Sequence, residues 1–72
     1  MRYAIVIEWA GSNYSAYAPD VAGCVATGAT LEEVKRHMRE ALDFHLEGLR
    51  EDGLPIPEPT TQVDTVELQA AA

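Results

Sequence analysis

The sequence predicts a small α+β domain in the order βββαβ, with one helix packed on one face of a small mixed sheet. Three observations support this prediction. Short β-branched and aromatic runs separated by turn residues come first, one long amphipathic segment follows, and a short apolar run comes last. A chain of 72 residues has room for one small core and excludes two domains. We therefore expect a single domain over residues 1–72.

The first strand is expected over residues 2–10. Its large apolar side chains share one parity and are Tyr3, Ile5, Ile7 and Trp9. The opposite parity is also apolar at its centre, where Ala4 and Val6 lie. A Gly-Ser-Asn turn then leads into a short second strand over residues 14–18, and a third strand is expected over residues 24–27. These segments predict a three-stranded meander.

The helix is expected to begin after Thr30, which has the capping-box spacing to Glu33. Apolar side chains then recur on one helical face, with His45 among them: Leu31, Val34, Met38, Leu42, His45 and Leu49. Gly53 can adopt the left-handed conformation that ends a helix, and Pro55 prevents the helix from continuing. A helix of this length is long enough to cross a small sheet.

A last strand is expected over residues 63–68, paired parallel to the first, before an end over residues 70–72 without features. A single helix covers only one sheet face, so the other face presents Ala4 and Val6. An apolar face on a marginal domain usually binds a partner. The lone Cys24 cannot form an internal disulfide, which leaves self-association as a means of stabilisation. We predict a homo-oligomer, a dimer or higher, with Ala4 and Val6 at its interface.

The charge balance restricts the choice of partner. Asp and Glu number 12 against 5 Lys and Arg, which gives a net charge of -7. This charge disfavours phosphate backbones and favours a basic protein reached by electrostatic steering. The apolar run over residues 3–7 is much shorter than a membrane span. We expect a cytoplasmic protein with no membrane segment and no direct nucleic-acid ligand.

Reactive side chains give little support for catalysis. Glu8, Asp64 and Glu67 are expected on neighbouring strands, where paired carboxylates could hold a divalent cation as in a metal nuclease. No His or Lys lies beside them in the sequence, so solvent-facing acids are the better interpretation. Cys24 is interpreted as a small buried side chain and His45 as a core histidine. We predict no enzyme activity, no cofactor and no metal.

Two surface regions are candidate contacts. The loop after the second strand combines a carboxylate, exposed backbone and aromatic side chains. A protein–protein interface with an aromatic anchor and a polar rim requires these groups. Its candidate partner-binding residues are Tyr14, Tyr17, Asp20, Gly23 and Cys24. The alternative is that Asp20 only caps the turn after Pro19. The second region is the helix margin at His37 and Phe44, where Phe44 either contacts a partner or packs under the proline-rich linker.

Four segments resemble the HicB antitoxin family, and the similarity extends over nearly the whole chain. They are Asp20-Val21-Ala22-Gly23-Cys24, Gly28-Ala29-Thr30-Leu31-Glu32-Glu33, Glu47-Gly48-Leu49 and Asp52-Gly53-Leu54-Pro55-Ile56-Pro57-Glu58-Pro59. The family motif usually has a proline at the position of Ala22. The resemblance implies a partial RNase H-like fold of βββαβ order that lacks the catalytic set of the nuclease. It also implies a partner, the small basic mRNA-cleaving toxin HicA.

Many full-length members of that family continue into a DNA-binding domain, whereas this sequence stops directly after its expected last strand. We therefore expect no C-terminal DNA-binding domain. The function that the resemblance implies is a non-catalytic antitoxin that binds and occludes a HicA-type toxin in a type II toxin-antitoxin system. The alternative is a solitary HicB-like interaction module without a toxin.

Overall fold

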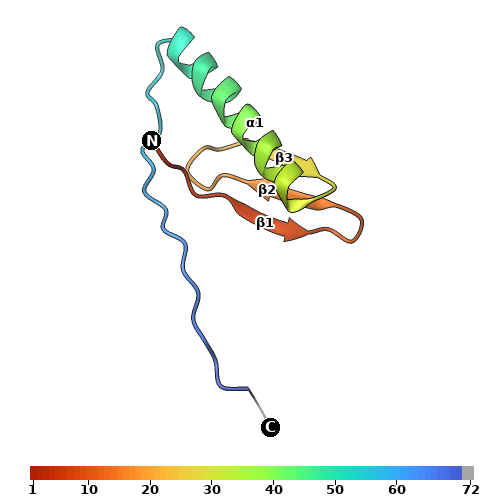
Figure 1. Cartoon of the computed structure of the whole chain (residues 1–72). Helices are drawn as coiled ribbons and strands as arrows, with labels where there is room; N and C mark the ends of the chain where they lie inside the picture. Colours follow the sequence, from red (N-terminus) through yellow and green to blue (C-terminus); the bar gives the residue numbers. More distant parts are fainter. Residues whose placement is uncertain (71–72) are drawn as a thin grey trace.

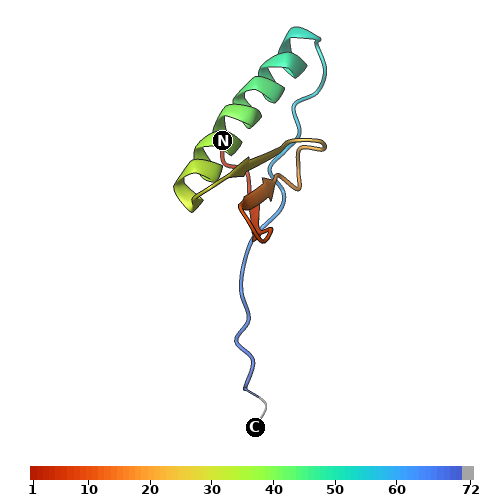
Figure 2. The same cartoon turned by 90° about the vertical axis from the view of Figure 1, so that its right-hand side faces the viewer.

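The computed structural model describes residues 1–70 and has the element order βββα (Figure 1). Its strands are β1 (Val6–Trp9), β2 (Tyr14–Tyr17) and β3 (Val25–Gly28), and helix α1 spans Leu31–Glu51. The strands form an antiparallel sheet in the order β1-β2-β3. Figures 1 and 2 show α1 crossing one face of this sheet. The predicted α+β fold, with one helix on a small sheet, is confirmed.

The core lies between α1 and the sheet face that it covers. Its buried side chains are Ala16, Ala18, Val21, Cys24, Val34 and Met38. Val34 and Met38 are both 0% exposed. Tyr3, Ile5 and Ile7 pack against this cluster, so the predicted parity of the first strand is correct. The buried Cys24 matches its interpretation as a small core side chain.

β3 and α1 lie close together at Gly28. A Cβ atom placed there would lie 2.5 Å from the backbone nitrogen of Val34 and 2.8 Å from its Cα atom. These neighbours belong to the helix backbone and cannot rotate away. Glycine at position 28 therefore allows the first turn of α1 to lie directly on the sheet.

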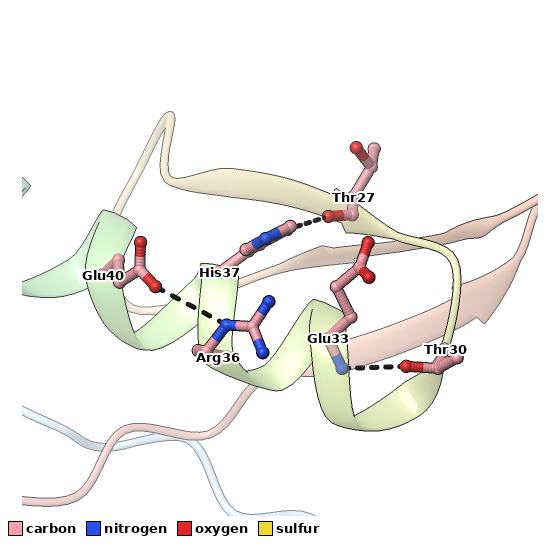
Figure 3. A network of polar contacts seen from close by, with 6 residues as sticks. All are labelled: Thr27, Thr30, Glu33, Arg36, His37 and Glu40. Atoms are coloured by element: carbon pink, nitrogen blue, oxygen red, sulfur yellow. Dashed lines mark hydrogen bonds and ion pairs between the residues drawn. The ribbon is translucent and has the colours of Figure 1, made fainter.

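Local hydrogen bonds fix the beginning of α1 (Figure 3). Thr30 Oγ1 accepts the Glu33 amide at 3.1 Å, as the capping box predicts. The Glu33 carboxylate in turn accepts the amide of Ala29 at 3.0 Å, one residue before the cap. One free amide of the first turn, that of Glu33, and the amide of Ala29 just before the helix are thereby satisfied.

The other end of α1 closes with a Schellman motif, as the position of the glycine predicts. The Gly53 amide donates to the Arg50 carbonyl at 3.1 Å, and the Leu54 amide donates to the Leu49 carbonyl at 2.9 Å. Gly53 has a φ of 68°, the left-handed conformation that the motif requires. The helix therefore stops where the sequence indicates.

The structure does not contain the predicted last strand over residues 63–68. Residues 63–68 form no strand, and the sheet is antiparallel where a mixed sheet was expected. After α1, the Tyr3 hydroxyl donates to the Pro57 carbonyl, and the Asp20 carboxylate accepts the Thr61 amide at 2.9 Å. Beyond these contacts the chain leaves the body of the molecule and does not turn back along β1 (Figures 1 and 2). The expected end over residues 70–72 lies outside the described residues at positions 71 and 72.

Within residues 1–70 we find no helix with the length and apolarity that crossing a membrane requires.

Candidate protein-binding surface

The sheet face opposite α1 carries a row of apolar side chains. Val6 is the register partner of Tyr17, and Tyr17 is the register partner of Val25. Because side chains alternate along a strand, all three point away from the side on which Ala16 is buried. Val25 is 67% exposed and Tyr17 is 43% exposed. We call Val6, Tyr17 and Val25 the apolar row.

A polar row lies next to the apolar row on the same face. Its members are the register partners Glu8, Ser15 and Thr27. Glu8 is exposed and supplies a carboxylate at the β1 side. An apolar strip with an acidic neighbour has the composition of a protein-binding patch with a polar rim.

Only some of the residues predicted for self-association and for partner binding lie beside one another in the structure. Val6 was predicted for self-association and Tyr17 for partner binding, and the register brings them side by side. Ala4 is half-buried and lies two residues before Val6 in the same extended chain. Val25 was missed by sequence reasoning, although the alternation along β3 gave a signal for it.

Tyr14 lies on the other side of the sheet from Tyr17. Its ring meets Trp9 edge to face, with the ring centroids 4.9 Å apart and an angle of 67° between the planes. Tyr14 also packs against the core cluster, while Trp9 is 59% exposed at the end of β1. The two tyrosines predicted as one aromatic surface therefore face opposite directions.

Asp20 binds the chain segment that follows the proline-rich linker. Besides the Thr61 amide, its carboxylate accepts the Thr61 hydroxyl at 2.7 Å and the Thr60 hydroxyl at 3.2 Å. These hydrogen bonds, that of the Thr61 amide above all, lower the pKa of the Asp20 carboxyl. The sequence left open a partner contact or a turn cap. The sequence analysis did not predict the contact of Asp20 with Thr61, because two residues 41 positions apart leave no local signal in the sequence.

Acidification is expected to release Thr61 from Asp20. The pKa of Asp20 is lower in the folded chain than its ordinary value of 3.8. The hydrogen bonds of the Asp20 carboxylate therefore stabilise the fold fully above pH 3.8, and this stabilisation is lost as the pH falls through the lower pKa of the folded state. The Thr61 amide proton, followed by NMR during an acid titration, is expected to shift together with the Asp20 carboxyl carbon. The Asp20→Asn variant is the control, because it has no carboxyl group to titrate. A Thr61 amide that does not respond in the unsubstituted chain contradicts the link.

The remaining residues of this loop differ in exposure. Gly23 is exposed with a φ of 79°, so the chain turns there with its backbone open to solvent. Cys24 is 4% exposed, and burial raises the pKa of its thiol. The loop therefore offers a partner the backbone near Gly23 and not the side chain of Cys24.

The helix margin is held against β3. His37 Nδ1 lies 2.7 Å from the Thr27 carbonyl oxygen, and Arg36 pairs with Glu40 at 3.8 Å on the exposed side (Figure 3). Phe44 is 84% exposed and does not pack under the linker. The alternative in which Phe44 packs under the linker is therefore wrong, and a contact between Phe44 and a partner stays a prediction.

The carboxylates considered for a metal site are far apart in the fold. Glu8 lies on β1, whereas Asp64 and Glu67 lie on the segment that leaves the body, so their expected placement on neighbouring strands is wrong. Across residues 1–70 we find no group of three or more His, Cys, Asp or Glu side chains arranged to hold a metal ion.

A small sheet covered on one side by a helix, with a partly exposed apolar row on the other side, defines a domain suited to binding another protein. The chain belongs to the family described as HicB_like antitoxin of bacterial toxin-antitoxin systems, whose model matches residues 3–71. This membership confirms the resemblance found in the sequence.

Two relatives and one solved structure illustrate the similarity. An uncharacterized 14.9 kDa protein of Haemophilus phage HP1 is 42% identical over 57 residues, which cover 79% of this chain but only 43% of the phage protein. A UPF0150 protein of Helicobacter pylori strain J99 is 39% identical over 68% of each chain. The structure, a HicA3 and HicB3 toxin-antitoxin complex, matches with a TM-score of 0.72 and 32% identity, over 83% of this chain and 70% of the matched chain.

Proposed function

We propose that the chain is a non-catalytic antitoxin that binds and occludes a small basic HicA-type mRNA-cleaving toxin through the uncovered face of its sheet. The observation that carries this proposal is the apolar row beside Glu8, in which Tyr17 and Val25 are exposed and Val6 is half-buried, on a chain with a net charge of -7. Family membership and the similarity to a toxin-antitoxin complex support a toxin as the partner.

The chemistry of this face fits such a partner. Tyr17 is central in the apolar row, and a tyrosine supplies a large contact area together with a polar hydroxyl group. Val6 and Val25 flank it and would exclude water from the contact. The negative charge of the chain attracts a basic protein over distance and speeds the encounter. In this proposal apolar contacts supply the affinity and charge supplies the association rate.

Replacing Tyr17 with alanine is expected to weaken toxin binding by about 2 kcal/mol, roughly thirtyfold, because the substitution removes the central side chain of the contact. The measurement is a calorimetric titration against the purified toxin encoded beside this gene, made catalytically inactive. Phe44→Ala is the matched control, since it removes an aromatic side chain that is even more exposed but lies on α1. Circular dichroism verifies that both variants are folded.

The opposite pattern would contradict the proposed surface. If Tyr17→Ala binds like the unsubstituted chain while Phe44→Ala loses affinity, the toxin contacts the helix margin and not the sheet. If no small basic toxin is encoded beside the gene, the solitary interaction module becomes the better description.

We also propose that the chain is a homo-oligomer in the cytoplasm. Seven hydrophobic residues are buried among residues 1–70, six of them in the core cluster, which is a small number for a domain without a disulfide among its described residues.

A further inference from the structure

Most of the cations of this acidic chain lie on α1. The chain has 5 Lys and Arg residues against 12 Asp and Glu. Arg36 and Arg50 each pair with a glutamate of α1, at 3.8 Å and 3.3 Å. Within residues 1–70, Lys35 and Arg39 form no ion pair. Two positive charges of α1 are therefore left without a counter-charge.

These two cations are neighbours on the helix. Lys35 and Arg39 are four residues apart, so their side chains lie one turn apart on the same flank of α1. Like charges at this spacing repel each other and destabilise a helix. Asp43 lies one turn further along this flank, and in the described part of the chain it pairs with neither cation. An anion bound between Lys35 and Arg39 relieves the repulsion.

A groove lies beside these cations, between α1 and the N-terminal segment that precedes β1. Its cavity volume is about 360 Å³, near the lower end of the range for small-molecule sites. Ile5, Leu42 and Leu46 line its floor and are buried or half-buried. The charged lining residues are all exposed and form its rim: Lys35, Arg39, Asp43 and Arg50. Three of the 5 cations of the chain thus border one apolar groove.

The groove is elongated along the helix. Its lining residues on α1 extend from Lys35 to Arg50, a stretch of helix about 22 Å long. The N-terminal segment contributes alternate residues, Met1, Tyr3 and Ile5, whose side chains an extended chain directs to one side. A long apolar floor with charge at its rim suits an unbranched aliphatic chain that ends in a charged group.

We propose that this groove binds an aliphatic carboxylate, with its hydrocarbon chain on the floor and its carboxylate between Lys35 and Arg39. The planar guanidinium of Arg39 offers two donors that match the two carboxylate oxygens, and the Lys35 ammonium adds another donor. The hydrocarbon chain covers Leu42 and Leu46 and removes their apolar surface from water.

Charge selects this class of ligand. A neutral apolar molecule leaves Lys35 and Arg39 without a counter-charge, and an apolar cation is repelled by them. The groove lies between α1 and the N-terminal segment, whereas the proposed toxin contact uses the sheet face away from α1. The inference therefore adds a small-molecule site to the proposed toxin-binding function and does not depend on it.

The test is an NMR titration of the full chain, with isotope-labelled methyl groups, against sodium decanoate at concentrations below those at which it forms micelles. The methyl signals of Ile5, Leu42 and Leu46 are expected to shift together along one saturable curve. Acetate has the carboxylate without the chain, and decyltrimethylammonium has the chain with a positive charge. Both compounds are expected to leave these signals unchanged.

Arg39→Gln removes one cation of the rim and is expected to raise the dissociation constant of decanoate about tenfold, because a hydrogen bond between two charged groups is lost. Arg36→Gln is the matched control, since the Arg36 side chain pairs with Glu40 outside the groove (Figure 3). It is expected to bind decanoate like the unsubstituted chain. Both arginines are exposed, and circular dichroism verifies that both variants are folded.

Several results would overturn the inference. One is a titration in which decanoate leaves the signals of Ile5, Leu42 and Leu46 unchanged. Another is an equal response to acetate or to decyltrimethylammonium, because the groove then does not select an apolar anion. A third is an Arg39→Gln variant that binds decanoate no more weakly than Arg36→Gln. Since no toxin is present, each of these outcomes leaves the proposed toxin binding to its own test.

Discussion

Replacing Met38 with alanine is expected to lower the free energy of unfolding by about 2–5 kcal/mol, because it leaves a cavity where a long side chain fills the core. Met38 is 0% exposed and joins α1 to the residues of the sheet. A domain of this length has a total stability of about 4–11 kcal/mol. Met38→Ala is thus expected to remove a large share of the free energy of unfolding.

Urea unfolding followed by circular dichroism measures this effect. Phe44→Ala is the control, because Phe44 is on the same helix but 84% exposed, and its removal is expected to change the stability by less than about 0.5 kcal/mol. Equal losses for the two variants would mean that the helix buries a different face.

The same substitution at two glycines is expected to have opposite effects. Gly28→Ala forces a methyl group to within 2.5 Å of the Val34 nitrogen, so β3 and α1 must separate. Overpacking of this kind typically lowers the stability by about 1–3 kcal/mol. At Gly48, inside α1, the added Cβ meets nothing within 4 Å. Gly48→Ala is therefore expected to raise the stability by about 0.5–1 kcal/mol, since alanine has the higher helix propensity.

Thermal unfolding of the two variants beside the unsubstituted chain provides the measurement. The melting temperature is expected to fall for Gly28→Ala and to rise for Gly48→Ala. A neutral Gly28→Ala would show that the first turn of α1 can move off the sheet without loss of stability.

The parts of the fold that local chemistry determines could be predicted from the sequence. Thr30 with Glu33 begins the helix and Gly53 ends it, and each signal acts within a few residues. The alternation of Tyr3, Ile5 and Ile7 likewise identified the core side of the first strand. These signals need no information about distant parts of the chain.

The last strand could not be placed in the same way. Residues 63–68 have a strand pattern, but pairing depends on where the preceding segment directs the chain. That direction is fixed by the contacts of Tyr3 with Pro57 and of Asp20 with Thr61, which join residues far apart in the sequence. A local pattern states which conformation a segment favours and leaves its partner undetermined.

The candidate surface was predictable to a similar extent. Tyr17 and Val6 were both identified, but their adjacency follows from the register of β1 with β2, which the sequence did not specify. Tyr14 was grouped with Tyr17 because they are close in the chain, although odd and even positions of a strand face opposite sides. Its true neighbour, Trp9, comes from the other strand of the hairpin.

The two long-range anchors of the linker also affect the order in which the chain folds. β1, β2, β3 and α1 each pack against the element next to them in sequence, so the loops closed early in folding are short. The contacts of Tyr3 with Pro57 and Asp20 with Thr61 join residues 54 and 41 positions apart, and closing longer loops costs more entropy. We therefore expect the sheet and helix to form first and the linker to dock on them as the last step of folding.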